Sequence, residues 1–303
     1  MSAILAEGDA YAIASATCFA FSSVTIARGA RPDSGDNGAF VSLLVTTAIA
    51  GSAWAILGLA NGFAPVTARA LFWFAGAGVL TAFVGRVFFY ATVERLGAMR
   101  SSTLQRLNPF LAVVMGVAVL GETVAGRTAV GMALVVASFA VLVAGARSRE
   151  AAPLRADAVA RMGYVYGVIS ALGYSAGYLL RKMGLAEAHD AFLGAAVGCA
   201  VGALLFLATA AFRPRYARSV RATFAQPNPW FIGAGVMSSF GQVLYFAALN
   251  AAPMSRVALI VSMEVFITLF LGYAFLRRRE RLTAALVVAA ILGVAGTAFI
   301  VGA

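Results

Sequence analysis

Ten long apolar segments follow one another along this chain, and they restrict what it can fold into. A helix needs about 20 mostly apolar residues to cross the hydrocarbon core of a bilayer. Segments of this kind run over residues 9–28, 38–60, 70–93, 100–120, 127–146, 161–181, 191–212, 229–250, 255–276 and 282–302. They are longer than the alternating runs of a membrane barrel, and a helix satisfies its own backbone groups in lipid. We therefore expect an all-α polytopic membrane protein with ten transmembrane helices.

Composition and charge exclude several other classes of protein. Hydrophobic residues make up 62% of the chain and charged residues only 12%, whereas soluble domains are about one-quarter charged. The net charge of +11 is expected at the membrane surface, because no polar stretch is long enough for a nucleic-acid-binding domain. Cys18 and Cys199 lie inside apolar segments, so they indicate neither a disulfide nor a metal site. The sequence has no nucleotide-binding P-loop, and we expect no cofactor and no ATP drive.

The second half of the chain repeats features of the first half at an offset near 155 residues. The run WFAGAGV at 73–79 matches WFIGAGV at 230–236, and Arg100 matches Arg256. Each half carries five expected helices, and this odd number makes the second half insert upside down relative to the first. Inverted repeats are typical of transporters, which hold substrate near the middle of the membrane between the repeats.

We therefore expect two inverted five-helix repeats around a central cavity. The first repeat covers residues 1–146 and the second covers 161–303, and the polar, proline-bearing stretch 147–160 links them. The first segments of the two repeats agree with this division, because Arg28 corresponds to Arg181.

Several short motifs make the chain resemble a known family. The third segment ends in FFYATVERLGAMRSS, the fourth contains Asn108-Pro109, and LGET precedes Gly131. In these motifs, and in YFAALNAAPMS and Glu280 of the second half, the chain resembles the ten-helix EamA-type branch of the drug/metabolite transporter superfamily. The resemblance implies a basket-like bundle with a central cavity, and small metabolites such as amino acids or nucleotide sugars as substrates. Val265 stands where the family has a proline in the second repeat.

Basic residues are unevenly divided between the connections. The odd-numbered connections, helix ends included, carry sixteen: Arg28, Arg31, Arg95, Arg100, Arg147, Arg149, Arg155, Arg161, Arg213, Arg215, Arg218, Arg221, Arg277, Arg278, Arg279 and Arg281. The even-numbered connections carry five: Arg69, Arg127, Arg181, Lys182 and Arg256. Cytoplasmic loops are enriched in Lys and Arg. We therefore expect the odd-numbered connections in the cytoplasm and both termini outside, in the inner membrane of a bacterial-type cell.

Three charged residues lie inside the apolar segments away from their ends, at a depth where a charge costs about 2.5–3.5 kcal/mol on insertion scales. They are Arg86 in the third segment, Arg106 in the fourth and Glu264 in the ninth. Charges at this depth usually face a cavity or a partner charge, so we predict all three in a substrate site. Arg106 is also close enough to its helix end to reach the membrane surface. Glu264 has two interpretations: a buried ion pair with an arginine, or a group that couples transport to protons or substrate.

Polar and aromatic side chains in the same segments complete the predicted substrate site: Tyr90, Asn108, Tyr174, Tyr178, Gln242 and Tyr245. Tyr174 and Tyr178 are four residues apart and share one face of a helix, where they can stack on a substrate or bind a cation. Pro109 disturbs the helix beside Asn108, and a broken turn can expose backbone groups to a ligand. Packing between helices is the alternative interpretation for each of these residues.

These features favour a secondary active transporter, specifically an exporter, of a small polar metabolite such as an amino acid. Arg86 or Arg106 would bind the substrate's carboxylate and Glu264 would lie near its amine. Alternating access, coupled to protons through Glu264, would drive the transport. The expected partners are this small molecule and the lipid bilayer, and we expect the monomer to function alone.

Two other functions remain open from the sequence. A passive channel would not need two opposed repeats. An intramembrane lipid-modifying enzyme would need paired acids, a metal cluster or a histidine at the membrane surface, and the sequence offers only His189 in a polar connection. We therefore expect that the protein is not an enzyme.

Overall fold

The computed structural model of the chain describes residues 2–29, 38–96, 104–105, 107–123, 126–147, 158–276 and 284–301. Within these ranges every regular element is a helix: α1 (Ser2–Gly29), α2 (Ala39–Asn61), α3 (Ala68–Gly78), the π-helix η1 (Val79–Gly85), α4 (Arg86–Leu96), α6 (Leu107–Leu120), α7 (Gly126–Arg147), α8 (Ala158–Ala188), α9 (Ala191–Phe212), α10 (Pro214–Ala225), α11 (Pro229–Ala251), α12 (Met254–Val261), α13 (Glu264–Leu276) and α14 (Ala284–Val301). The all-α fold that the sequence predicts is confirmed.

The described helices include six stretches that are long and apolar enough to cross a membrane, by length and composition: Glu7–Gly29, Ala39–Asn61, Ala68–Phe89, Ala191–Phe212, Pro229–Ala251 and Met254–Gly272. Three further apolar stretches are shorter: Asn108–Leu120, Gly126–Val141 and Val287–Val301. Together with α8, these stretches coincide with the ten apolar segments of the sequence. The fold is that of a polytopic membrane protein, and the exact number of ten crossings stays a prediction.

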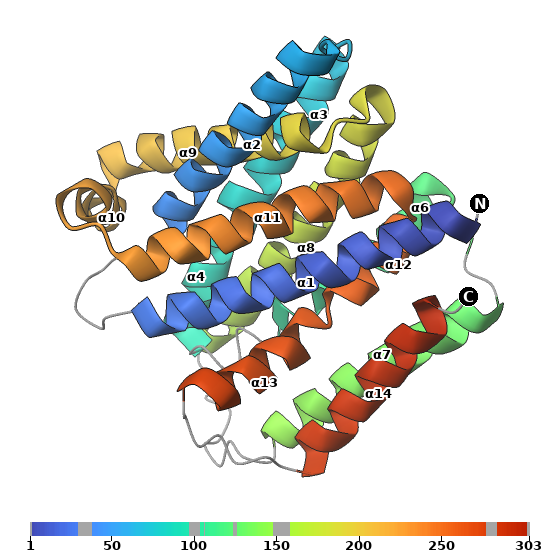
Figure 1. The fold of residues 1–303 in the computed structure, drawn as a ribbon. Helices are drawn as coiled ribbons and strands as arrows, with labels where there is room; N and C mark the ends of the chain where they lie inside the picture. The colour runs from blue at the N-terminus through green and yellow to red at the C-terminus, as the bar shows by residue number, and fades with distance from the viewer. Residues whose placement is uncertain are drawn as a thin grey trace.

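The two halves of the chain interlock instead of forming separate bundles. In Figure 1, α1 of the first half lies along α11 of the second half, and α2 lies close to α9. α3 and α4 pack on α8, so every one of these helices has its main neighbour in the other half. A cavity enclosed by such a bundle is therefore lined by residues from both halves.

The last helices of the two halves, α7 and α14, lie side by side at one edge of the molecule (Figure 1). Their crossing depends on Gly131 and Gly296, which face each other. A Cβ atom on Gly131 would lie 2.6 Å from the carbonyl oxygen of Gly296, and one on Gly296 would lie 2.7 Å from that of Gly131. Without side chains at these positions the two backbones approach closely, as in many pairs of membrane helices.

Two of the apolar segments are interrupted rather than continuous. The segment expected over 70–93 changes into the π-helix η1 between α3 and α4. The segment expected over 255–276 breaks between Val261 and Glu264, although Val265 replaces the family's proline. A tight turn makes this break without a proline, because the Met263 amide bonds the Ile260 carbonyl at 3.0 Å and the Ser262 hydroxyl bonds the Leu259 carbonyl at 2.5 Å. Interruptions of this kind in membrane helices often lie at binding sites.

One helix lies where the sequence predicts a simple connection. α10 occupies most of the stretch 213–228, between α9 and α11. Pro214 stands at its start, where a proline has no amide hydrogen to lose, and the Gln226 amide closes it by bonding the Ala222 carbonyl. A search for long apolar segments does not detect this helix, because the helix is basic and amphipathic.

Candidate functional site

A cavity of about 520 Å³ lies between helices of the two halves. Seven of the nine residues that the sequence predicts for substrate binding line it: Arg86, Asn108, Tyr174, Tyr178, Gln242, Tyr245 and Glu264. The side chain of Tyr90 and the whole of Arg106 lie outside the described part of the chain. The fold thus brings together side chains from α4, α6, α8, α11 and α13, and their role in binding stays a prediction.

A charged residue of the cavity wall was missed by the sequence reasoning, which assigned Arg181 to a connection. α8 continues to Ala188, so Arg181 lies two turns inside the helix and is only 7% exposed. The helix continues because residues 182–188 contain no proline and only one glycine. The internal repeat could have drawn attention to Arg181. It corresponds to Arg28 of the first half, in two segments that also match at Ser22 and Ser175.

Neutral groups hold the Arg181 guanidinium in the cavity wall. Its Nη1 donates to Gln242 Oε1 at 2.8 Å, and its Nη2 donates to Thr81 Oγ1 at 3.4 Å. The rings of Tyr178, Tyr245 and Phe246 surround it, with centroids 5.4, 5.7 and 5.0 Å from the guanidinium carbon. Ring faces stabilise a cation at these distances. Among the described residues no carboxylate forms an ion pair with Arg181.

Tyr245 presents an unused hydroxyl beside this guanidinium. The side chain is 2% exposed, lies 4.9 Å from the Tyr178 ring and lines the cavity. Its hydroxyl finds no hydrogen-bond partner within the described part of the chain. Because buried hydroxyls are nearly always bonded, this group is available to a molecule in the cavity.

Asn108 is held by α8 at the wall of the cavity. The Ser175 hydroxyl lies 2.8 Å from Asn108 Oδ1 and 3.0 Å from its carbonyl oxygen, and Asn108 Nδ2 donates to the Tyr178 hydroxyl at 3.4 Å. Pro109 follows in the first turn of α6, where a proline is tolerated. Asn108 therefore ties α6 to α8 and positions Tyr178, as the packing interpretation expects, while it also lines the cavity.

Glu264 begins α13, immediately after the break in the ninth apolar segment. Its carboxylate accepts a hydrogen bond from Ser23 of α1 at 3.0 Å. The positive end of the α13 dipole lies at this residue, and it favours a negative charge there. Within the described ranges Glu264 forms no ion pair with an arginine. The sequence left two interpretations of Glu264 open. For the ion-pair interpretation, the described residues contain no arginine partner.

Arg86 lies at the first position of α4, directly after the π-helix. Its Nη1 donates to the carbonyl oxygen of Ala39 at 3.3 Å, which connects α4 to the start of α2. Ala39 and Gly38 line the same cavity. The cavity therefore reaches the helix ends that adjoin the odd-numbered connections.

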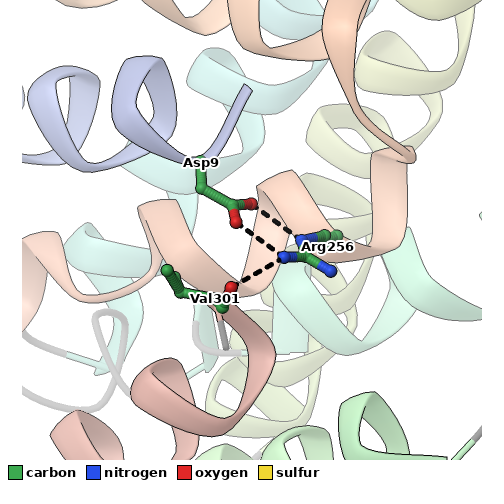
Figure 2. Close-up of polar contacts among 3 residues, drawn as sticks. All are labelled: Asp9, Arg256 and Val301. Atoms are coloured by element: carbon green, nitrogen blue, oxygen red, sulfur yellow. Dashed lines mark hydrogen bonds and ion pairs between the residues drawn. The ribbon is translucent and has the colours of Figure 1, made fainter. Parts of the chain in front are cut away.

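At the opposite end of the bundle a buried ion pair joins helices of the two halves, as Figure 2 shows. Arg256 Nε and Nη2 donate to the two carboxylate oxygens of Asp9 at 2.7 and 2.6 Å, and Nη2 also donates to the Val301 carbonyl at 3.3 Å. Asp9 is 1% exposed and Arg256 is 7% exposed. The sequence analysis counted Arg256 with an even-numbered connection. The structure places it in the first turn of α12, where its bonds to Asp9 and Val301 join α1, α12 and α14.

Two further charges bind helix ends near this pair. Glu122 accepts hydrogen bonds from the first amides of α12, those of Met254 and Ser255. Lys182 donates to the carbonyl oxygens of Leu249 and Ala252 at the end of α11. Charges that cap helix ends with these signs stabilise them. The Glu122 contact joins the two halves, and the Lys182 contact joins two helices of the second half, at the end that adjoins the even-numbered connections.

Comparisons with known proteins agree with the resemblance in the sequence. The model of the EamA-like transporter family matches residues 6–144 and again residues 161–302. A solved structure titled "Crystal structure of protein" is similar in fold, with a TM-score of 0.65 and 18% sequence identity over 96% of this chain and 94% of that chain. At this identity the likeness concerns the fold alone. A comparison with curated proteins gave no match.

Proposed function

The chain belongs to the EamA-like transporter family, and we propose that it is a secondary active transporter that exports a small polar metabolite such as an amino acid. Membership makes it a membrane transporter of the drug/metabolite type, as the sequence predicts. The substrate class, the coupling ion and the direction of transport are our proposal. This proposal rests on the charged side chains that face the cavity.

One observation carries the proposed substrate class: a buried arginine faces the cavity without a carboxylate partner among the described residues. A buried charge is stable only when it is paired or well bonded, and Arg181 has only neutral partners. A substrate carboxylate would supply the missing charge through paired N–H donors. A cavity of about 520 Å³ is within the size range of small-molecule sites.

The amine of an amino acid would lie toward Glu264. Glu264 and Arg86 line the same cavity as Arg181, so an acidic and two basic groups face one space. This favours a zwitterion over a dianion or a plain cation. Tyr245 would add a neutral hydrogen bond through its unused hydroxyl.

We propose alternating access between the conformation described here and one open at the other end. In the present conformation Asp9, Arg256 and Glu122 join helices of the two halves at one end, while the cavity extends to Gly38 and Ala39 at the other. Proton binding at Glu264 would bias the exchange between these two conformations. Among the described residues its hydrogen-bond partner is Ser23, and no arginine pairs with it, so we propose that this carboxylate gains and loses the coupled proton.

The experiment is substrate exchange in reconstituted vesicles. Vesicles loaded with a mixture of unlabelled amino acids should take up radiolabelled amino acids from outside, with saturation. Arg181→Gln should abolish this uptake, whereas the control Arg69→Gln, with a side chain 71% exposed at the surface, should not. Uptake that rises linearly without saturation would indicate a channel, and no exchange of any acidic or zwitterionic metabolite would refute the substrate class.

We also propose that the odd-numbered connections face the cytoplasm. Support comes from Arg181 and Arg256, since both are buried and so do not count as surface charges of the even-numbered connections. Only Arg69, Arg127 and Lys182 then remain of the five, and the charge asymmetry increases. A cysteine in place of Ser148 should resist a membrane-impermeant thiol reagent added to intact cells. Rapid labelling of that cysteine, compared with the parent protein, would reverse the orientation.

A further inference from the structure

α10 differs from the other described helices because its composition is basic. The stretch 213–228, RPRYARSVRATFAQPN, has four arginines and no acidic residue. Figure 1 shows α10 along its own axis at the end of α9, while α9 and α11 run across the view. α10 therefore lies across the ends of two membrane helices, with its axis roughly parallel to the membrane surface.

One side of α10 packs on the bundle. Tyr216 packs edge-on against Phe206 of α9 with ring centroids 4.9 Å apart, and Ser219 is 4% exposed. Val220 packs in the same cluster, with Phe40 of α2. These contacts fix which side of the helix faces outward.

Arginines lie on the outward side of α10, and exposed aromatic rings lie at its two ends. Arg213, Arg218 and Arg221 are exposed, and the last two are three residues apart on one face. Phe212, the last residue of α9, is 84% exposed. Phe224 is 70% exposed, although its ring also meets that of Phe40 edge-on at 6.4 Å. We call the three arginines, Phe212 and Phe224 the α10 patch. Exposed phenylalanines are unfavourable in water, but an apolar ring beside basic residues is typical of helices that lie in the bilayer interface.

The residues around the α10 patch are also of the kind found at the membrane–water interface. Trp230 begins α11 just beyond α10 and is 43% exposed. The guanidinium carbon of Arg28, at the end of α1, lies 4.6 Å from its ring centroid. Tryptophan is enriched at the membrane–water interface, so three helix ends meet there in aromatic and basic side chains.

We propose that the α10 patch binds the phosphate groups of anionic phospholipids and holds this end of the bundle at the membrane surface. Guanidinium groups bind phosphate oxygens in pairs and carry their charge at any relevant pH. Phe212 and Phe224 enter the boundary between headgroups and acyl chains. This inference does not depend on the substrate proposed above.

The test uses the full-length protein with one tryptophan on α10 itself. In a Trp54→Phe/Trp73→Phe/Trp230→Phe background, Phe224→Trp provides the reporter. Vesicles contain phosphatidylglycerol and phosphatidylcholine in fixed proportion, with bromine on the acyl chains of either one. The surface charge is then the same in both, and the quenching of tryptophan fluorescence measures which lipid lies beside α10.

Quenching should be stronger when phosphatidylglycerol carries the bromine. Arg218→Gln/Arg221→Gln should lower this preference at least about tenfold, since each arginine near a charged membrane contributes roughly a fivefold preference. Arg218→Lys/Arg221→Lys should keep most of it, and the control Arg69→Gln should keep all of it. Equal quenching by the two lipids in the parent would overturn the proposal, as would a glutamine variant with an unchanged preference.

Discussion

Arg256 and Arg181 are equally buried, each 7% exposed, yet their surroundings differ completely. Arg256 is bound by both oxygens of the Asp9 carboxylate at the end of the bundle that adjoins the even-numbered connections. Arg181 has an amide, a hydroxyl and three aromatic rings around it, and it faces the cavity. The first arginine is neutralised within the protein. The second has no carboxylate partner among the described residues, and we propose that a substrate carboxylate supplies one. Burial alone thus does not distinguish a structural charge from a binding charge, whereas the partners do.

The largest effect is expected where the structural charge is broken. Asp9→Ala strands the Arg256 guanidinium among packed helices, and loss of one partner of a buried pair costs about 3–5 kcal/mol. Unfolding of the purified protein in detergent should shift by that amount. The double variant Asp9→Ala/Arg256→Met, which removes both charges, should recover most of the loss. A single variant as stable as the parent would mean that the pair is not a structural lock.

The binding charge should show the reverse behaviour. Arg181→Gln should change the free energy of unfolding much less than Asp9→Ala does, because removal of a buried charge without a carboxylate partner offsets the loss of its neutral contacts. It should weaken substrate binding at least about 30-fold, the equivalent of roughly 2 kcal/mol for a truncated buried charge pair. Equilibrium binding of a labelled substrate and thermal unfolding, measured on the same preparation, separate the two effects. If unfolding shifts by as much as in Asp9→Ala, the two arginines do not differ in kind.

Arg86 should resemble Arg181 with a smaller effect. Its single described bond is to the Ala39 carbonyl at 3.3 Å, so most of its donors are available. Arg86→Lys keeps the charge but loses bidentate geometry, and we expect a few-fold weaker substrate binding. Arg86→Ala should weaken binding about tenfold. Wild-type affinity for acidic and zwitterionic substrates in a folded Arg86→Ala protein would make Arg86 structural.

The smallest effect on affinity is expected at the carboxylate of the cavity. Glu264→Gln retains the volume and the Ser23 contact while it removes the proton site. Substrate should bind and exchange across the vesicle membrane, but a pH gradient should no longer drive its accumulation. Normal pH-driven accumulation would end the proposal of proton coupling at Glu264. Failure to fold would instead indicate that Glu264 is paired within the protein.

Much of the fold could be predicted because hydropathy is a local property of the sequence. Each apolar run coincides with a described helix, and polar residues at depth, such as Glu264 and Gln242, line the cavity as expected from their cost in lipid. What was missed depends on contacts distant in sequence. Asp9 and Arg256 are separated by 247 positions, and neither residue alone reveals the other.

Departures from regular membrane helices could not be predicted from the apolar pattern either. Arg181 lies where the apolar run of α8 ends but the helix does not. The break before Glu264 comes from a turn around Ser262 instead of a proline. α10 was missed for a different reason, because a search for apolar runs cannot detect a basic helix that lies across them.

The pairing of α1 with α11 has a consequence for biosynthesis. The ribosome completes α1 some 200 residues before α11, a delay of roughly 10–40 s at ordinary translation rates. During that time α1 cannot pack against α11, and Asp9 has no Arg256 to pair with. The nascent first half must therefore persist as loosely associated helices, and α1 reaches its final place only when the last third of the chain has been inserted.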